Sequence, residues 1–335
     1  MAIVLLPLVG PFHRRFPRFN AVTVLESVQL VRPTTVLTTA VTEKDLRGES
    51  WRELDEPALD LAITWATRAG KAVAGVGEPS PDPQAQEDFG RYLEESGLAL
   101  PEVQEVLAHE ATLSSLLGQA LDARRIQLEL LPTLRSLHAA RQAAFGEGPG
   151  TDWLGERTQV MADRIEVHEA ADTVVLAPVD HLPALERALE ERDVAWSYGD
   201  DVPPSEAARE RALLDVALAG QSDDPASLLD ALARVKTPEA RLAEAEVFLR
   251  AGDVEAALTT LREASKLDFV EPAWLPGWLL ARLGQLADVA GARDEARRAY
   301  RGVLALSWVP AVARETAEAG LEQPFQFPGA ESEDL

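Results

Sequence analysis

Two histidines that follow apolar, strand-like runs are the residues of this chain best placed to do chemistry. His13 stands three residues after Gly10 in the run LLPLVGPFHRRF, and His181 stands directly after Asp180 in TVVLAPVDHL. Ligands of open α/β sheets bind beyond the carboxyl ends of the strands. Both imidazoles are therefore expected at the same edge of one sheet, where they either form a shared site or hydrogen-bond neighbouring backbone.

The elements that must position these histidines are those of an α/β domain over residues 1–200. Alternating strands and helices predict a mainly parallel sheet. Strands are expected at 2–9, 34–38, 72–77, 173–179 and 194–197. Helices are expected at 20–31, with Asn20 as the N-cap, and at 56–71, 152–166 and 181–192. The other histidines, His109, His138 and His168, fall in helical stretches among charged residues and are expected to be solvated.

A long helical stretch, residues 84–147, interrupts this domain. Its apolar spacing predicts helices with breaks near Pro101 and Pro132. Three uses remain open for this insertion: a lid over the strand ends, a helical insertion of the kind found in related proteins, or a dimerisation face. A homodimer is therefore one alternative for the assembly.

Residues 201–325 change to a composition without any strand signal, after the acidic linker DDVPPSE. Gly291 stands 39 residues after Gly252, and each glycine is followed five residues later by an alanine. This recurrence predicts stacked helical hairpins, with a third copy near Gly220. Trp274 and Trp278 in this region, like Trp308, are expected to pack between repeats or to form an aromatic binding surface. Residues 326–335 are expected to be a disordered acidic tail.

Charge and composition limit the partners. The chain has 335 residues, 56 acidic against 32 basic, and a formal net charge of -24. Such a field repels nucleic-acid phosphates and anionic lipid surfaces, so neither partner is expected. The absence of cysteine excludes disulfides, thiolate catalysis and cysteine-ligated metals. No run approaches the ~18 apolar residues of a membrane-spanning helix, and the apolar start reads as a strand, so a cytoplasmic protein is expected.

Four motifs in order resemble one known superfamily over residues 1–200. They are GPFH (10–13), RPTTVLTTA (32–40), GERTQVMADRI (155–165) and VVLAPVDHLPALERAL (174–189). The arrangement is similar to that of the superfamily containing the TraB pheromone-shutdown proteins, the Tiki metalloproteases, the erythromycin esterases and the ChaN-type haem-binding proteins. The resemblance implies that the histidines, with a glutamate, hold a divalent metal or activate water.

The chain departs from this pattern at two places. The resemblance expects a glutamate at the end of the second strand, where Thr38 and Thr39 stand, and a glycine before the second histidine, where Pro178 stands. Threonine is a poor substitute for a metal-binding carboxylate. The substitutes that the sequence offers are Asp180, beside the second histidine, and Glu43 or Asp45, downstream of the second strand.

The C-terminal region resembles tetratricopeptide repeats, most clearly in LLARLGQLADVAGARDEARRAYRGVLALS (279–307). That resemblance implies a surface that holds a peptide or a helix of another protein. It names no particular ligand.

Two functions follow. The favoured one is a protein-interaction scaffold in which the α/β domain has lost its carboxylate and the repeats hold a partner. The alternative is a metal-assisted hydrolase of peptide or ester bonds, with His13 and His181 as metal ligands or general bases and Arg157 stabilising an oxyanion. The general acid of this hydrolase would come from Glu43, Glu156 or Asp180. If the chain is not a hydrolase, Arg157 is expected to pair with Glu156 or another acidic neighbour.

Overall fold

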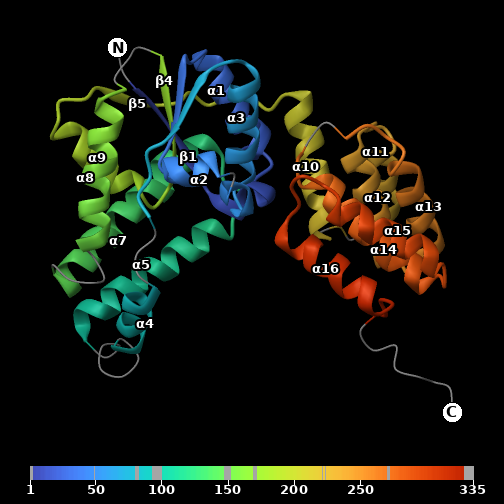
Figure 1. Ribbon diagram of the computed structural model, residues 1–335. Coiled ribbons are helices and arrows are strands. Elements are labelled where there is room, and N and C mark those ends of the chain that lie inside the picture. The colour runs from blue at the N-terminus through green and yellow to red at the C-terminus, as the bar shows by residue number, and fades with distance from the viewer. Residues whose placement is uncertain are drawn as a thin grey trace. The chain divides into compact units, whose positions relative to one another are not determined.

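The computed structural model describes residues 3–48, 50–79, 83–92, 100–146, 152–168, 172–220, 222, 224–269 and 272–327. The chain divides into two compact units, Met1–Arg209 and Glu210–Leu335. Figure 1 shows that the first unit combines a sheet with helices, whereas the second is built from helices. None of the described helices has the length and apolar character that crossing a bilayer requires.

The described residues form one five-stranded sheet, with all its neighbouring strands parallel. Its strands are β1 (Ile3–Leu8), β2 (Thr35–Thr38), β3 (Ala72–Gly75), β4 (Thr173–Pro178) and β5 (Trp196–Tyr198), in the order β3-β2-β4-β1-β5. The predicted α/β class and parallel sheet are confirmed. Strands buried on both faces read as near-continuous apolar runs, as β1 and β4 do.

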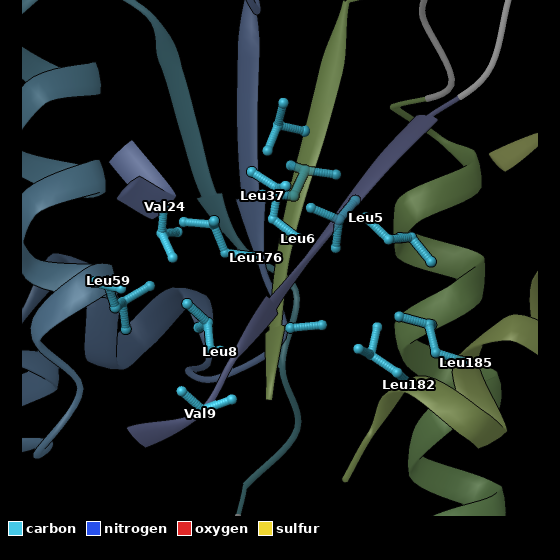
Figure 2. Packing of buried hydrophobic residues seen from close by; sticks show 14 of the residues in the cluster. Leu5, Leu6, Leu8, Val9, Val24, Leu37, Leu59, Leu176, Leu182 and Leu185 are labelled. Atoms are coloured by element: carbon cyan, nitrogen blue, oxygen red, sulfur yellow. The ribbon is translucent and has the colours of Figure 1, made fainter. Parts of the chain in front are cut away.

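Helices cover both faces of this sheet. Figure 2 shows Val24 and Leu59 packing on one side, and Leu182 and Leu185 on the other. The helices involved are α1 (Ala21–Val31) and α3 (Pro57–Arg68) on the first side, and α8 (Asp152–Glu166) and α9 (Leu182–Glu190) on the second. The central strands β4 and β1 therefore lie in the middle of the core, and their carboxyl ends deliver the chain to the two histidines.

Local signals set the ends of the elements that lead to His13. Gly10 has φ +61 and begins the short 3₁₀ helix η1 (Gly10–Arg15), so the turn after β1 uses a conformation that favours glycine. Asn20 caps α1 as predicted, because its Oδ1 accepts the N–H groups of Val22 at 3.0 Å and Thr23 at 3.1 Å. Two short helices, α2 (Glu43–Arg47) and η2 (Ser50–Glu53), connect β2 to α3.

The helical insertion begins a helix at Pro101 as predicted, but the break predicted at Pro132 is wrong. Its elements are α4 (Pro83–Tyr92), α5 (Pro101–Leu117), α6 (Ala123–Arg125), the π-helical η4 (Ile126–Leu130) and α7 (Leu131–Phe145). Pro132 lies in the first turn of α7, where the missing N–H costs little, and the wider π turn before it keeps the chain helical. The interruption lies instead at residues 118–122.

The second unit is a series of helices without a strand among its described residues. They are α10 (Glu206–Ala219), whose first four residues belong to the first unit, α11 (Pro225–Leu232), α12 (Pro238–Arg250), α13 (Val254–Ala264), α14 (Leu275–Val289), α15 (Arg293–Leu304) and α16 (Ala311–Glu322). Gly220, Gly252 and Gly291 follow the first helix of successive hairpins and have φ of +68, +82 and +75. The recurrent glycines therefore end equivalent helices in the left-handed conformation that favours glycine.

The apolar core of the second unit, called the repeat core after the predicted repeats, closes around Tyr300, which is fully buried on α15. A Cβ atom added at Gly284 or Gly320 would lie under 3.0 Å from its ring, so α14 and α16 approach the ring through glycines. Trp274 and Trp278 pack half-buried against the same core, which favours packing over a free aromatic surface. Of the tail predicted to be disordered, residues 328–335 lie outside the described residues.

Candidate functional site

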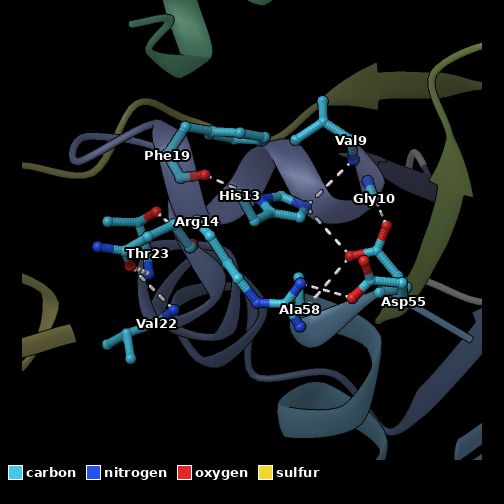
Figure 3. A network of polar contacts seen from close by, with 11 residues as sticks. Val9, Gly10, His13, Arg14, Phe19, Val22, Thr23, Asp55 and Ala58 are labelled. Carbon is cyan, nitrogen blue, oxygen red and sulfur yellow. Dashed lines mark hydrogen bonds and ion pairs between the residues drawn. The ribbon is translucent and has the colours of Figure 1, made fainter. Parts of the chain in front are cut away.

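The imidazole of His13 is buried and held at both ring nitrogens by backbone groups. Figure 3 shows the ring between Val9 and Phe19. Nε2 accepts the N–H of Val9 at 3.1 Å, and Nδ1 donates to the carbonyl of Phe19 at 2.8 Å. An N–H can only donate and a carbonyl can only accept, so these partners fix the neutral tautomer that carries its proton on Nδ1.

Glu56, a residue that the sequence interpretation missed, is the carboxyl group beside His13. Its Oε1 lies 3.3 Å from Nε2 of His13 and accepts the N–H of Ala58 at 3.3 Å, while its Oε2 accepts the N–H of Gly10 at 2.7 Å. The signal was present in the sequence, because Glu56 precedes Pro57. A proline at the first helical position marks the residue before it as an N-cap, where a side-chain acceptor is favoured.

Burial moves the two pKa values of this pair in opposite directions. It lowers the pKa of His13 to about 4 and raises the pKa of Glu56 to about 7. The distance alone would suggest an ion pair, but the Val9 N–H occupies the Nε2 lone pair and disfavours a protonated ring. Since His13 therefore stays neutral at pH 7, the contact with Glu56 is one between a neutral imidazole and a titrating carboxyl group.

His181 lies after β4 and contacts the threonine that replaces the expected glutamate. Its Nδ1 and the hydroxyl Oγ1 of Thr39 are 3.1 Å apart, and both side chains are buried. Burial lowers the pKa of His181; the negative charge of Asp180 opposes this shift and the positive charge of Arg157 adds to it. Among the described residues no hydrogen bond reaches the other ring nitrogen, Nε2.

Arg157 is half-buried on α8 and holds the loop that follows β3. Its Nη2 donates to the carbonyl of Glu78 at 2.7 Å. Arg164, two turns further along α8, donates to the carbonyl of Gly77 at 2.8 Å and forms an ion pair with the Glu78 carboxylate. Glu156 is exposed, and the acidic groups close to Arg157 are Glu78 and Asp180. Of the predicted site residues, Arg157 and His181 thus come within electrostatic range of each other, while Glu156 faces solvent.

The expectation that His138 is solvated is wrong. His138 lies on α7 on the side of the buried Leu131 and Leu134, which precede it by seven and four residues, and Nδ1 is buried without a partner among the described residues. Burial lowers its pKa to about 4, with Arg141 adding to the shift and Asp180 opposing it. His168, by contrast, is exposed as expected.

Two of the proposed substitutes for the expected carboxylate, Glu43 and Asp45, have other partners. Glu43 accepts the N–H of Gly75 at 3.0 Å and the Nε–H of Arg47 at 2.8 Å. Asp45 accepts the Thr42 hydroxyl at 2.6 Å in a capping box at the start of α2. Both carboxylates therefore stabilise local structure rather than either histidine.

A metal held jointly by His13 and His181 does not fit these contacts. A neutral imidazole offers one lone pair, and that of His13 already accepts the Val9 N–H. Thr39 contacts His181 with a hydroxyl in the place of a carboxylate. Among the described residues, no three His, Asp or Glu side chains form a group able to hold a metal ion. The residues present therefore do not fit the divalent metal that the resemblance implies.

The comparisons with known proteins give no further guide. No protein-family model matches the chain, and no curated protein or solved structure matches it either. The resemblances to the TraB and Tiki superfamily and to tetratricopeptide repeats therefore stay predictions.

Proposed function

We propose that this chain is an interaction protein whose helical repeats hold a segment of a partner protein. The observation that carries the proposal is the stacking of successive hairpins with equivalent helices side by side. A stack of this kind forms an extended surface that is suited to binding another chain. Binding a partner in this way requires no catalytic side chain.

Ion pairs between equivalent helices support this stacking. Arg282 on α14 forms a bidentate ion pair with Glu246 on α12, in which Nε donates to Oε1 at 2.6 Å and Nη2 donates to Oε2 at 3.4 Å. Arg262 on α13 forms another with Glu295 on α15, at 2.8 and 2.6 Å. First helices are thus paired with first helices and second with second, as translation of one hairpin along the stack requires.

The contacts of His13 fit a structural role better than a catalytic one. His13 has a hydrogen-bond partner at both ring nitrogens, and its neighbour Glu56 caps a helix. A general base or nucleophile must reach a substrate atom, which a ring enclosed by backbone on both sides does not. The His13 site is accordingly assigned to holding the turn after β1.

Site-specific cross-linking tests the proposal. A photoreactive benzoylphenylalanine replaces Glu246, on the side where α12 and α14 meet, or Glu295 of α15 as the matched control, since each substitution removes one ion pair between equivalent helices. In cells of the source organism, the Glu246 position is expected to capture one protein in a discrete adduct that excess unlabelled chain suppresses. Equal capture at both positions, or none at Glu246, would contradict a partner surface on the first helices.

A hydrolase that uses His181 is the second candidate. Nε2 of His181 has no hydrogen-bond partner among the described residues, and Arg157 supplies a nearby positive charge. The lowered pKa keeps the ring neutral at pH 7 but also makes it a weak base, which ranks this function second. It predicts hydrolysis of activated esters or peptides that is lost in His181→Ala, and the absence of turnover in the wild type would eliminate it.

A further inference from the structure

An extended segment of the chain lies against the repeat unit after its last helix. Residues 323–327, the C-terminal strap, follow α16, and Gln323 has φ -133 and ψ 141. The backbone N–H of Phe325 donates to Oδ2 of Asp288 at 2.9 Å. Phe327 packs against the repeat core, and its ring meets that of Phe325 edge-on at 5.6 Å.

Asp288 is the centre of the contacts that hold this strap. Its side chain is fully buried near the end of α14, where Nη1 of Arg293 donates to both carboxylate oxygens at 2.9 and 3.0 Å. The hydroxyl of Tyr300 donates to Oδ2 at 3.0 Å. A buried carboxylate with two such donors is fixed in position, so it can accept the N–H of a chain that lies beside it.

Arg293 extends the same network to backbone carbonyls. It donates to the carbonyl of Gly320 at 2.7 Å and to that of Leu321 at 3.1 Å. Asp288 and Arg293 therefore contact main-chain atoms at the end of α16 and in the strap. Main-chain contacts give affinity without demanding a particular sequence, while side-chain pockets supply the selectivity.

A hollow of about 550 Å³ lies beside the strap. Its walls include Gln285 of α14, Thr316 of α16 and the strap residues Phe325 and Gln326. The strap lines this space without filling it. Room therefore remains for the larger side chains of another segment bound in the same way.

We propose that the Asp288 site binds an extended segment of a partner protein with aromatic residues at alternate positions, and that the strap occupies this site in the free chain. The strap indicates what this site accepts: an extended backbone at Gln323, and aromatic side chains two residues apart at Phe325 and Phe327. This inference rests on the proposed function and names the partner's chemistry. A tethered strap competes at a high effective concentration, so it weakens binding of any free segment.

A fluorescein-labelled peptide Gln-Pro-Phe-Gln-Phe is the probe, with binding to the full chain measured by fluorescence polarisation. Phe325→Pro removes the N–H that Asp288 accepts, and Gln326→Pro is the matched control because no described hydrogen bond uses its N–H. The Phe325→Pro chain is expected to bind the probe at least tenfold tighter than wild type, and the Gln326→Pro chain is expected to match wild type.

A change in the probe makes the test independent of how the variants fold. The same peptide with an N-methyl group on its first phenylalanine lacks the N–H that Asp288 accepts, and it is expected to bind Phe325→Pro about tenfold more weakly. Equal binding of both peptides, or no gain in Phe325→Pro, would overturn the inference. If a partner is still captured at position 246, the proposed function survives that failure; if capture also fails, both are lost.

Discussion

Nε2 of His13 lies 3.3 Å from Oε1 of Glu56, and both side chains are buried at the turn after β1. Burial holds the pKa of His13 at about 4 and that of Glu56 at about 7, so both groups are neutral between these values. Above pH 7 Glu56 becomes a carboxylate that the N–H groups of Gly10 and Ala58 stabilise. This pair joins β1, η1 and α3, and its titration should be visible in the stability of the protein.

Glu56→Gln is expected to gain stability relative to wild type as the pH rises. The pKa of Glu56 is 4.5 when unperturbed and about 7 in the fold. Its contribution to the free energy of unfolding is therefore full below pH 4.5 and is lost as the pH rises through 7, by about 3 kcal/mol at most. Urea unfolding at pH 5 and pH 8 measures the effect. A difference between variant and wild type that is the same at both pH values would refute it.

His13→Ala is expected to lower the free energy of unfolding by about 2–4 kcal/mol at pH 7, because it opens a cavity and leaves the Val9 N–H and the Phe19 carbonyl unpaired. The exposed His168→Ala should stay within about 0.5 kcal/mol of wild type. A lowered pKa contributes stability that is full above pH 6.5 and lost as the pH falls through 4, so the deficit of His13→Ala should shrink toward pH 4. A deficit that grows in acid would contradict this assignment.

Thr39→Val is expected to cost about 1–2 kcal/mol, because it keeps the shape of the side chain but leaves Nδ1 of His181 without its hydroxyl partner. Thr39→Ser keeps the hydroxyl and removes one buried methyl group, so a loss of about 1 kcal/mol or less is expected. Chemical denaturation of the two variants compares them directly. If valine is tolerated better than serine, the hydroxyl does not hold the imidazole.

Gly320→Ala is expected to destabilise the repeat unit by about 1–3 kcal/mol, because its methyl group would overlap the buried ring of Tyr300. Gly155→Ala is the control: nothing lies within 4 Å of a Cβ there, and alanine favours the helix. Thermal unfolding of both variants gives the comparison. Equal midpoints would show that α16 shifts to admit the methyl group.

The strands of the sheet and their parallel direction were predictable because their signals are local, whereas the strand order β3-β2-β4-β1-β5 was not predicted. β1 and β4 are near-continuous apolar runs, and Asn20 is a residue type favoured at the start of a helix. The recurrent Gly252 and Gly291 likewise marked equivalent helix ends, since each adopts positive φ. Patterns of this kind depend on a few neighbouring residues, so they can be identified without knowing the tertiary contacts.

The side-chain partners at the candidate site were not predictable in the same way. Glu56 reaches His13 across 43 positions of the chain, and Thr39 reaches His181 across 142, so only the folded sheet brings each pair together. The burial of His138 follows from the packing of α7. The charged residues next to His138 in the sequence gave no sign of that packing. The helix break predicted at Pro132 was wrong for a local reason: a π turn before this proline keeps the helix continuous.

The proposed function requires that the repeat unit bind a partner without any chemistry at the histidines. The most direct measurement is the yield of the cross-linked adduct at position 246 in a chain that also carries His181→Ala. The adduct is expected at the same yield as in the chain with His181 intact. A yield that falls severalfold while the chain remains folded would tie partner capture to His181 and contradict the account.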